Sequence, residues 1–337
     1  MSGAEYVVVL VGAASETGRE VSAVLRERAF PVAEVRLYDD MPDDELFDED
    51  ASDADIFPLG EVDVEGADVV FLCHHGALAA ELAPRARAAG ALIVDLTQSL
   101  SESGDAILVV PEVNPEAVAD EIERGAFACP IASAIALAVV LKPIDDAAEL
   151  KRVVVTSFEP ASAAGRLGID ELAQQTRDLL SGVSPDTKAF PQRLAFNLIP
   201  QVGDFVSGGR TRGEWLLESQ LRRVLELPDL PITGTSVYMP VFFGQACAVH
   251  VETERPLEAV VARTLLRAAP GLLLAEGEDD YPTLGDIIGS EATHVGRVRD
   301  DPTVPFGLAL WLAIDGLRKG AAVNAVQIAE RALSERA

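Results

Sequence analysis

The chain has 337 residues, of which 49% are hydrophobic, so it is long enough for two domains and can fill two cores. Its net charge of −28 argues against nucleic acid or an anionic membrane as a partner. No apolar run is long enough to span a bilayer, the N-terminus lacks a signal-peptide pattern, and the three widely spaced cysteines favour reduced thiols in the cytoplasm.

The first third of the chain alternates predicted strands with predicted helices. Residues 6–11 form a continuous apolar, β-branched run, which is typical of a strand buried on both faces of a parallel sheet. A turn at residues 12–18, bounded by Gly12 and Gly18, leads into a helix over residues 19–29. This order of elements opens a dinucleotide-binding fold. Further strands are predicted at residues 34–38, 68–72 and 92–96, with a helix over residues 78–89.

The stretch of residues 126–143 is the one around which the function is organised. It predicts a short strand end, a break at Pro130, and then a buried helix with Ser133 near its first turn. Lys142 and Pro143 are expected to close that helix. The start of such a helix points backbone N–H groups outward and stabilises an anion or a thiolate.

The sequence changes character at about residue 151. A strand is predicted at residues 153–158 and an amphipathic helix at residues 167–180. Thr211 and Glu214 have the spacing of a capping box at the start of another helix. Two more strands are predicted at residues 232–242 and 246–254, and a helix is expected to open at Pro256.

Four segments together carry a family resemblance. They are VVPEVNPE at residues 109–116, Lys142-Pro143 after the apolar helix, AFNLIPQV at residues 195–202, and a tail that includes residues 317–327. These motifs resemble the aspartate-semialdehyde dehydrogenase family, and the resemblance extends over nearly the whole chain.

The resemblance implies a fold and an assembly. We expect an α/β protein with an N-terminal Rossmann-like parallel-sheet domain at residues 1–127, a semialdehyde dehydrogenase dimerisation domain of α+β type at residues 128–315, and a C-terminal helix at residues 316–337 that returns to the first domain. The family performs the NAD(P)-dependent reductive dephosphorylation of aspartyl phosphate in lysine, methionine and threonine biosynthesis. It dimerises through the second domain, so a homodimer is expected here.

The reaction of this family needs a cysteine thiolate and a histidine base. The nucleophile stands ten residues before the Lys-Pro pair, and counting back from Lys142 gives Ala132. The base position holds Gln245, which hydrogen-bonds but does not cycle a proton near neutral pH. Cys129 lies three residues too early, so we expect it to serve only if the loop is rebuilt. Its simpler interpretation is a small buried apolar residue.

The substrate-binding positions implied by the resemblance also differ from the family pattern. Two positions that carry a substrate-binding arginine in the family hold Ser101 and Tyr238, and a phosphate-assisting lysine is replaced by Leu216. The glutamine at the domain junction is Glu159, and the asparagine near the nicotinamide is Gly316. Nucleophile, base and substrate cations are therefore all missing from one predicted pocket.

The predicted cofactor site departs from the pattern as well. Ser15 stands where the family has its middle glycine, and its Cβ can block the approach of a pyrophosphate. Residues 39–50 are strongly acidic, and no lysine or arginine occurs from residue 37 to residue 84. A 2′-phosphate would be repelled there, so NAD is favoured over NADP. Our prediction is that the chain uses no cofactor, with Gly12 and Gly18 as the candidate binding residues if it does.

We expect no metal site, since His74 and His75 are adjacent and no spaced ligand completes a set. The leading hypothesis is a catalytically inactive family member whose pocket binds a partner protein or a small ligand. The alternative is an active dehydrogenase that uses a site rebuilt around Cys129. A third possibility is a sensor that keeps a nucleotide site without turnover.

Overall fold

The computed structural model describes residues 5–40, 55–73, 77–277 and 279–336. The chain divides into two compact units, Met1–Pro130 with Ala321–Ala337, and Ile131–Gly320. The domain limits expected from the sequence differ from these by a few residues. Most of the predicted acidic loop and the His74-His75 pair lie outside the described residues.

The first unit is built on a parallel sheet of seven strands in the order β3-β2-β1-β4-β5-β7-β6. The central strands are apolar on both faces, which suits a sheet covered on both sides. The strands are β1 Tyr6–Val11, β2 Val32–Asp39, β3 Ile56–Pro58, β4 Val69–Leu72, β5 Leu92–Asp95, β6 Ile107–Leu108 and β7 Ala126–Ala128. The order β3-β2-β1-β4-β5 is that of a Rossmann-like sheet.

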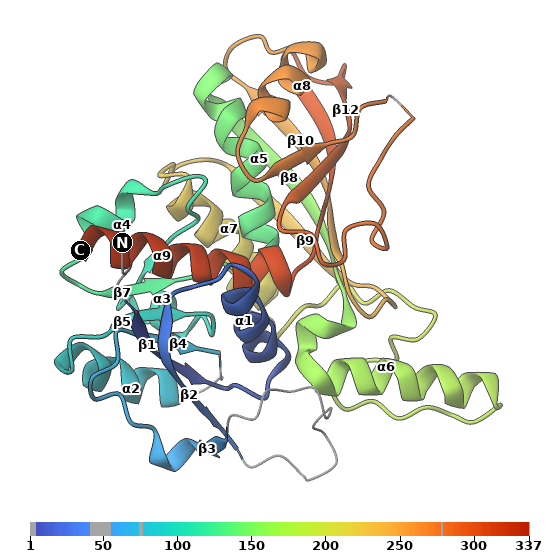
Figure 1. The fold of residues 1–337 in the computed structure, drawn as a ribbon. Coiled ribbons are helices and arrows are strands. Elements are labelled where there is room, and N and C mark those ends of the chain that lie inside the picture. The colour runs from blue at the N-terminus through green and yellow to red at the C-terminus, as the bar shows by residue number, and fades with distance from the viewer. Residues whose placement is uncertain (1–4, 41–54, 74–76, 278, 337) are drawn as a thin grey trace. The chain divides into compact units, whose positions relative to one another are not determined.

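The helices of the first unit include one from the far end of the chain. They are α1 Glu16–Glu27, α2 Ala77–Ala88, α3 Ser99–Ser103, α4 Glu116–Asp120 and α9 Asn324–Arg336. Figure 1 shows α9 beside α1, with both in front of the sheet. The buried side chains of α9, such as Val326 and Ile328, belong to the same apolar core as those of β1 and β4. The C-terminal helix is therefore part of this core.

The second unit has a mixed sheet of six strands in the order β11-β12-β13-β10-β8-β9. The strands are β8 Leu150–Glu159, β9 Ile232–Tyr238, β10 Gln245–Thr253, β11 Leu272–Leu274, β12 Thr293–Asp301 and β13 Gly307–Ile314. The helices are α5 Ala132–Ala148, α6 Gly165–Leu180, α7 Arg212–Val224 and α8 Ala259–Ala268. Helix α5 packs on the sheet between α7 and α8. The two sheets confirm the predicted α/β class with an N-terminal Rossmann-like unit.

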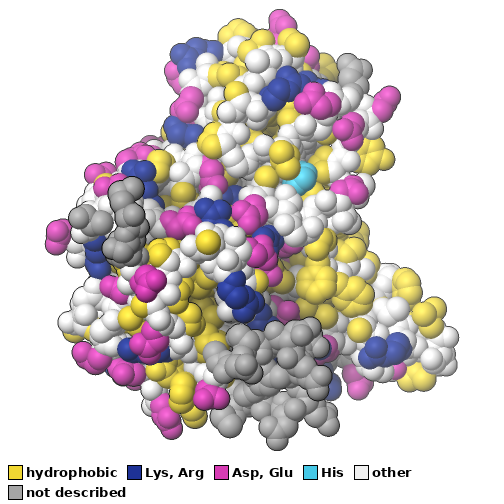
Figure 2. Space-filling model, viewed as in Figure 1, with side chains coloured by type: hydrophobic (Ala, Val, Ile, Leu, Met, Phe, Trp, Pro, Cys, Tyr) yellow, Lys and Arg dark blue, Asp and Glu magenta, His cyan; other side chains and the backbone are white. Residues whose placement is uncertain are grey.

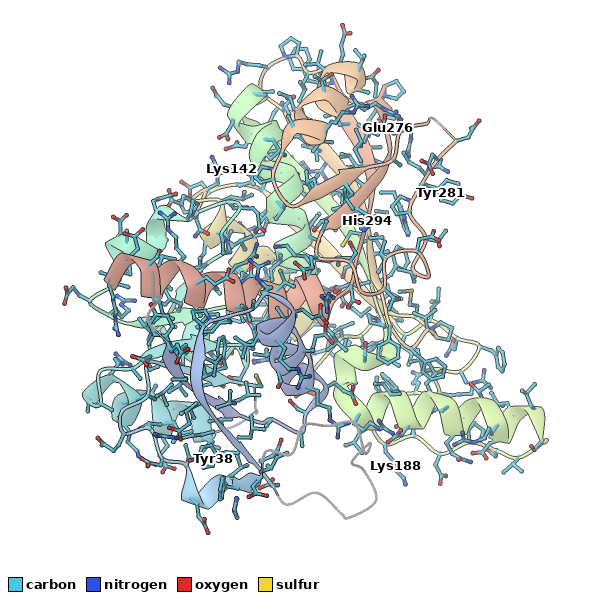
Figure 3. All side chains as sticks on the ribbon, in the orientation of Figure 1. Tyr38, Lys142, Lys188, Glu276, Tyr281 and His294 are labelled. Atoms are coloured by element: carbon cyan, nitrogen blue, oxygen red, sulfur yellow. The ribbon has the colours of Figure 1, made fainter. Side chains whose placement is uncertain are left out.

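Helix α5 does not end where the sequence predicts. It continues through Lys142 and Pro143 to Ala148, so the expected closure at the Lys-Pro pair is wrong. Proline removes one backbone donor, but Ile144 and Ala148 beyond it are buried, and this packing offsets the lost bond. Lys142, labelled in Figure 3, pairs with Asp146 one turn further along the helix.

Two other helices begin at residues different from those expected. Helix α1 starts at Glu16, three residues early, because the Ser15 hydroxyl accepts a hydrogen bond from the N–H of Gly18 and so caps the helix. Helix α8 starts at Ala259 rather than at Pro256. The predicted capping box is confirmed, since Thr211 and Glu214 exchange both of its hydrogen bonds. No helix within the described residues is long and apolar enough to cross a membrane.

Candidate functional site

The start of helix α5 lies at the centre of the candidate site. Ile131 precedes the helix in an extended conformation, and its N–H donates to the Gln220 side chain on α7 at 2.8 Å. Ala132 is the first helical residue and is partly exposed. Its methyl group lies so close to Gly320 that a Cβ added at Gly320 would be 2.4 Å from the Ala132 Cβ. A glycine is required at residue 320 for this approach.

Gly316 lies next to both the same methyl group and the side chain of Gln245. A Cβ added at Gly316 would lie 3.6 Å from the Ala132 Cβ and 3.4 Å from Oε1 of Gln245. Gln245 is the first residue of β10, and Gly316 follows β13, so three separate elements meet here. The structure thus brings together the residues at the predicted nucleophile, base and asparagine positions. None of the three has a side chain that is a nucleophile or a base near neutral pH.

A buried carboxyl completes this group. Glu159 ends β8 and is 8% exposed, and Nε2 of Gln245 donates to its Oε2 at 2.6 Å. Burial raises the pKa of Glu159 to about 7, although hydrogen bonds from Ser157 and Gln245 act in the opposite direction. Glu159 is therefore a carboxyl that changes its charge near neutral pH. Sequence reasoning placed Glu159 in the site but missed this titration, because the burial that causes it is a property of the fold.

Tyr238 lies directly beside Glu159 in the sheet. It is the residue paired with Glu159 in the parallel register of β8 and β9. Burial and the negative charge of Glu159 raise the pKa of Tyr238 to about 12, so its hydroxyl stays neutral at physiological pH. Its ring packs edge-on against Phe190 at 5.1 Å between centroids. Tyr238 is therefore a neutral, buried side chain where the resemblance predicts a cation.

The other two predicted substrate-binding residues have structural roles of their own. Leu216 lies on α7 and is buried. Ser101 belongs to α3 of the first unit, where its hydroxyl donates to the carbonyl of Gln98 at 3.0 Å. The group around Ala132 in the second unit is thus defined by Gln245, Glu159, Tyr238 and Gly316.

Cys129 is a core residue of the first unit. It follows β7, its N–H donates to the carbonyl of Asp95 at 2.8 Å, and it is 2% exposed within the main apolar cluster. The side-chain amide of Asn324, on α9, lies 3.4 Å from its sulfur. The cysteine is therefore packed as a small apolar side chain rather than presented at the start of α5. All three cysteines are buried thiols.

The glycine turn of the first unit is tightly closed. A Cβ at Gly18 would lie 2.1 Å from the carbonyl oxygen of Gly12, and Gly12 itself has a φ of 89°, so both glycines are needed for the turn. Ser15 bridges them, because its hydroxyl donates to Gly12 and accepts from Gly18. This gives Ser15 a capping role that the sequence analysis missed, although a serine just before a helix is the usual signal for one.

The acidic residue at the end of β2 faces this turn. Asp39 accepts from the N–H of Ala14 at 2.6 Å through one carboxylate oxygen and from its neighbour Asp40 through the other. An acid in this place fits the ribose hydroxyls of NAD and repels the 2′-phosphate of NADP. Within the described residues, no group of three or more His, Cys, Asp or Glu side chains is arranged to hold a metal ion.

Comparison with known proteins identifies both units. Residues 7–121 match the family model described as semialdehyde dehydrogenase, NAD binding domain, and residues 141–319 match semialdehyde dehydrogenase, dimerisation domain. The first match does not support the prediction that the chain uses no cofactor. The second is consistent with the expected homodimer.

Individual relatives match over almost their whole length. Aspartate-semialdehyde dehydrogenase 2 of Vibrio cholerae is 38% identical, with 97% of each chain covered. A crystal structure of aspartate semialdehyde dehydrogenase II complexed with ASA from the same organism superposes with a TM-score of 0.94 and covers 98% of this chain and 99% of its own. A protein named USG-1 protein homolog from Azotobacter vinelandii is 35% identical, with 96% of each chain covered. By both domains and by these relatives, the chain belongs to the aspartate-semialdehyde dehydrogenase family.

Proposed function

We propose that this family member binds a small ligand at the start of helix α5 without performing the cysteine-dependent dehydrogenase reaction. The observation that supports this proposal is the group of Ala132, Gln245 and Gly316, in which Gly316 lies next to the side chains of both other residues. A thiolate must attack the aldehyde and a base must take its proton, and neither function is available from these side chains. Removing the nucleophile alone costs about 10⁶-fold in rate in a well-studied serine protease.

The nucleotide-binding unit is retained in this proposal. Asp39 would bind the ribose of NAD, and the turn that contains Gly12 and Gly18 would lie beside the bound nucleotide. The sequence has no basic residue between residues 37 and 84 that could bind the 2′-phosphate of NADP. NAD, when bound, would supply a hydride acceptor, but this chain provides no covalent intermediate to donate a hydride. We therefore expect NAD to bind more tightly than NADP and neither to be turned over.

The second unit carries the proposed homodimer contact. Figure 2 shows hydrophobic side chains gathered next to α6 in this unit. Helix α6 itself exposes the large apolar residues Leu167 and Leu180, and Phe196, Leu198 and Phe205 of the same unit are also exposed. Patches of this kind commonly become buried in an interface. Light scattering coupled to size-exclusion chromatography should give the mass of two chains.

The direct test is an assay of the family reaction with the full chain. Purified protein is mixed with L-aspartate semialdehyde, phosphate, and either NAD or NADP, and reduction of the cofactor is followed by absorbance. We expect no rate above the protein-free control. A thermal-shift titration with NAD and NADP in parallel reports whether the nucleotide binds when no reaction occurs.

An active aspartate-semialdehyde dehydrogenase is the second candidate. It is favoured by full-length matches to relatives that are named for this activity. It requires Cys129 to act as the nucleophile, and burial of that residue in the core of the first unit argues against this. Cofactor reduction by the wild type that disappears in Cys129→Ala would establish this candidate and refute the proposal.

A further inference from the structure

Strand β12 of the second unit contains a bulge that turns two arginines outward. Its register against β13 shifts between Gly296 and Arg299, so that two residues of β12 lie opposite one residue of β13. Val295 is fully buried, and regular alternation along the strand would bury Arg297 after it. The bulge instead buries Val298 and leaves Arg297 and Arg299 exposed. Bulges that re-aim a side chain in this way are frequent next to functional sites.

Arg297 has a backbone conformation that arginine rarely adopts. Its φ is 52°, in the left-handed region, where a Cβ is unfavourable. A glycine at this position would relieve the strain. The backbone therefore gives no reason for an arginine here, and its side chain has to supply one.

Carbonyl groups of the bulge hold two guanidinium groups in place. Nε of Arg263, which comes from α8, donates to the carbonyl of Val298 at 3.3 Å, and Nη1 of Arg299 donates to the carbonyl of Arg297 at 3.2 Å. Each guanidinium group has further N–H donors that these bonds do not use. Arg263, Arg297 and Arg299 line one hollow of about 910 Å³ between α8 and β12.

The carboxylates that line this hollow have partners of their own or are outnumbered. Glu276 is paired with Arg267 at 3.0 Å, and Asp300 accepts from the N–H of Ala259 at 2.7 Å. Asp279 is the third carboxylate. Four arginines therefore meet three carboxylates here, in a chain that has 27 basic and 55 acidic residues. Figure 2 shows basic side chains over α8 with acidic ones beside them.

The three arginines of the hollow have no carboxylate partner among the described residues. Arg263 and Arg299 donate only to the carbonyl groups of the bulge, and Arg297 makes no side-chain hydrogen bond or ion pair with any described residue. A guanidinium group keeps its charge at every physiological pH. An anion with several oxygen atoms would supply the partner that all three lack.

An aromatic ring lies at the edge of the hollow. Tyr281, labelled in Figure 3, is 50% exposed and lines both this hollow and a second one of about 610 Å³ together with the two β12 arginines. Its segment is fixed, since a Cβ added at Gly296 would lie 2.7 Å from Cδ of Pro282, and the carbonyl of Pro282 accepts from Nε1 of Trp311 at 3.0 Å. The ring is therefore held beside the arginines, where it can stack on a planar group of a ligand.

We propose that this hollow binds a phosphoryl dianion, either inorganic phosphate or the phosphate group of a small monoester, through Arg263, Arg297 and Arg299. A planar guanidinium group donates to two oxygens of a phosphate at once, and three such groups match its three terminal oxygens. A carboxylate has two oxygens and one charge, so it satisfies fewer of these donors. The site uses none of the residues around Ala132 and none of the nucleotide-binding turn, so the inference goes beyond the proposed function.

The experiment measures the binding of three probes to the full chain by isothermal titration calorimetry at pH 8 and low ionic strength. The probes are inorganic phosphate, phenyl phosphate and benzoate. We expect both phosphates to bind, and benzoate to bind about tenfold or more weakly than phenyl phosphate. Tighter binding of phenyl phosphate than of inorganic phosphate identifies a monoester as the ligand, because its ring stacks on Tyr281. Equal or tighter binding of inorganic phosphate identifies the inorganic ion.

Three variants assign the binding to the hollow. Arg297→Gly removes a guanidinium group where the φ of 52° suits glycine, so its midpoint of thermal unfolding should not fall. It should nevertheless weaken the binding of phenyl phosphate by about tenfold or more, which is the usual loss for a hydrogen bond to a charged group. Arg299→Gln should weaken binding similarly. Arg152→Gln, the control, removes an exposed arginine of β8 outside this hollow and should leave the affinity unchanged.

The inference is overturned if neither phosphate binds, if benzoate binds as tightly as phenyl phosphate, or if Arg297→Gly and Arg299→Gln both keep the full affinity. It is also overturned if Arg152→Gln weakens binding as much as they do. A lower unfolding midpoint for Arg297→Gly would show that this arginine serves stability, and would count against the inference in the same way. None of these results bears on the proposed lack of turnover or on NAD binding, which are measured in separate assays.

Discussion

The charge of Glu159 makes the stability of the protein depend on pH in a direction that can be calculated. The pKa of its carboxyl rises from 4.5 to about 7 on folding, chiefly because burial penalises the charged form. At pH values between 4.5 and about 7, the carboxyl is therefore protonated in the folded state and ionised in the unfolded state. Stability contributed by this group is fully present below pH 4.5 and is lost as the pH rises to about 7.

The size of the effect follows from the difference between the two pKa values. Each pKa unit corresponds to about 1.4 kcal/mol, so the loss approaches about 3 kcal/mol, most of it between pH 5 and pH 7. Glu159→Gln carries no charge and should not lose this stability. The variant is therefore expected to gain on the wild type by about 2 to 3 kcal/mol when the pH is raised from 5 to 8.

The assay is urea unfolding of wild type and variant at pH 5 and pH 8, followed by circular dichroism. Only the difference between the two proteins is interpreted, because other carboxylates titrate in both. Glu252→Gln, which removes an acid that is paired with Lys151, controls for the general effect of a Glu to Gln change. A wild-type to Glu159→Gln difference that stays constant between the two pH values would refute the assignment of a raised pKa to this residue.

Three further predictions concern the site and its supporting elements. Gly320→Ala should lower the free energy of unfolding by about 1 to 3 kcal/mol, because its Cβ would lie 2.4 Å from the Ala132 Cβ. Gly285→Ala is the control, since a Cβ at residue 285 would have no atom within 4 Å, and it should have little effect. Both variants are measured by thermal unfolding. Ala132→Cys should add one thiol that iodoacetamide labels at pH 7 in the native protein, while the three buried native cysteines stay unlabelled. The labelled residues are identified by mass spectrometry. Labelling of Cys129 in the wild type would contradict this prediction. Thr211→Ala should cost about 1 kcal/mol in chemical unfolding because it removes the capping-box acceptor of α7, and an unchanged midpoint would mean that the cap contributes nothing.

Much of the fold follows from local patterns. Strand β1 has the predicted bounds, because an apolar β-branched run between turn signals has few other solutions. The capping box of α7 was also predicted, since Thr211 and Glu214 carry the whole signal within four residues. The end of α5 was not, because proline is a strong local signal and only the tertiary burial of Ile144 and Ala148 overrides it.

The candidate site was only partly accessible from the sequence. Counting from Lys142 placed Ala132 correctly at the start of a helix, and the resemblance grouped it with Gln245 and Glu159 as a prediction. The pairing of those last two side chains, and the titration of Glu159 near neutral pH, depend on which strands are neighbours. That arrangement joins residues 86 positions apart in the chain, and no periodicity or spacing in the sequence encodes it.

The two glycines beside Ala132 differ in whether they can be replaced by a residue with a side chain. At residue 316 a new side chain would meet its neighbours at ordinary contact distances of 3.4 and 3.6 Å, so the lining of the pocket can be altered there by a single substitution. At residue 320 even a methyl group is excluded. New ligand preferences can therefore be acquired through residue 316, while residue 320 keeps the first turn of α5 in place as they change.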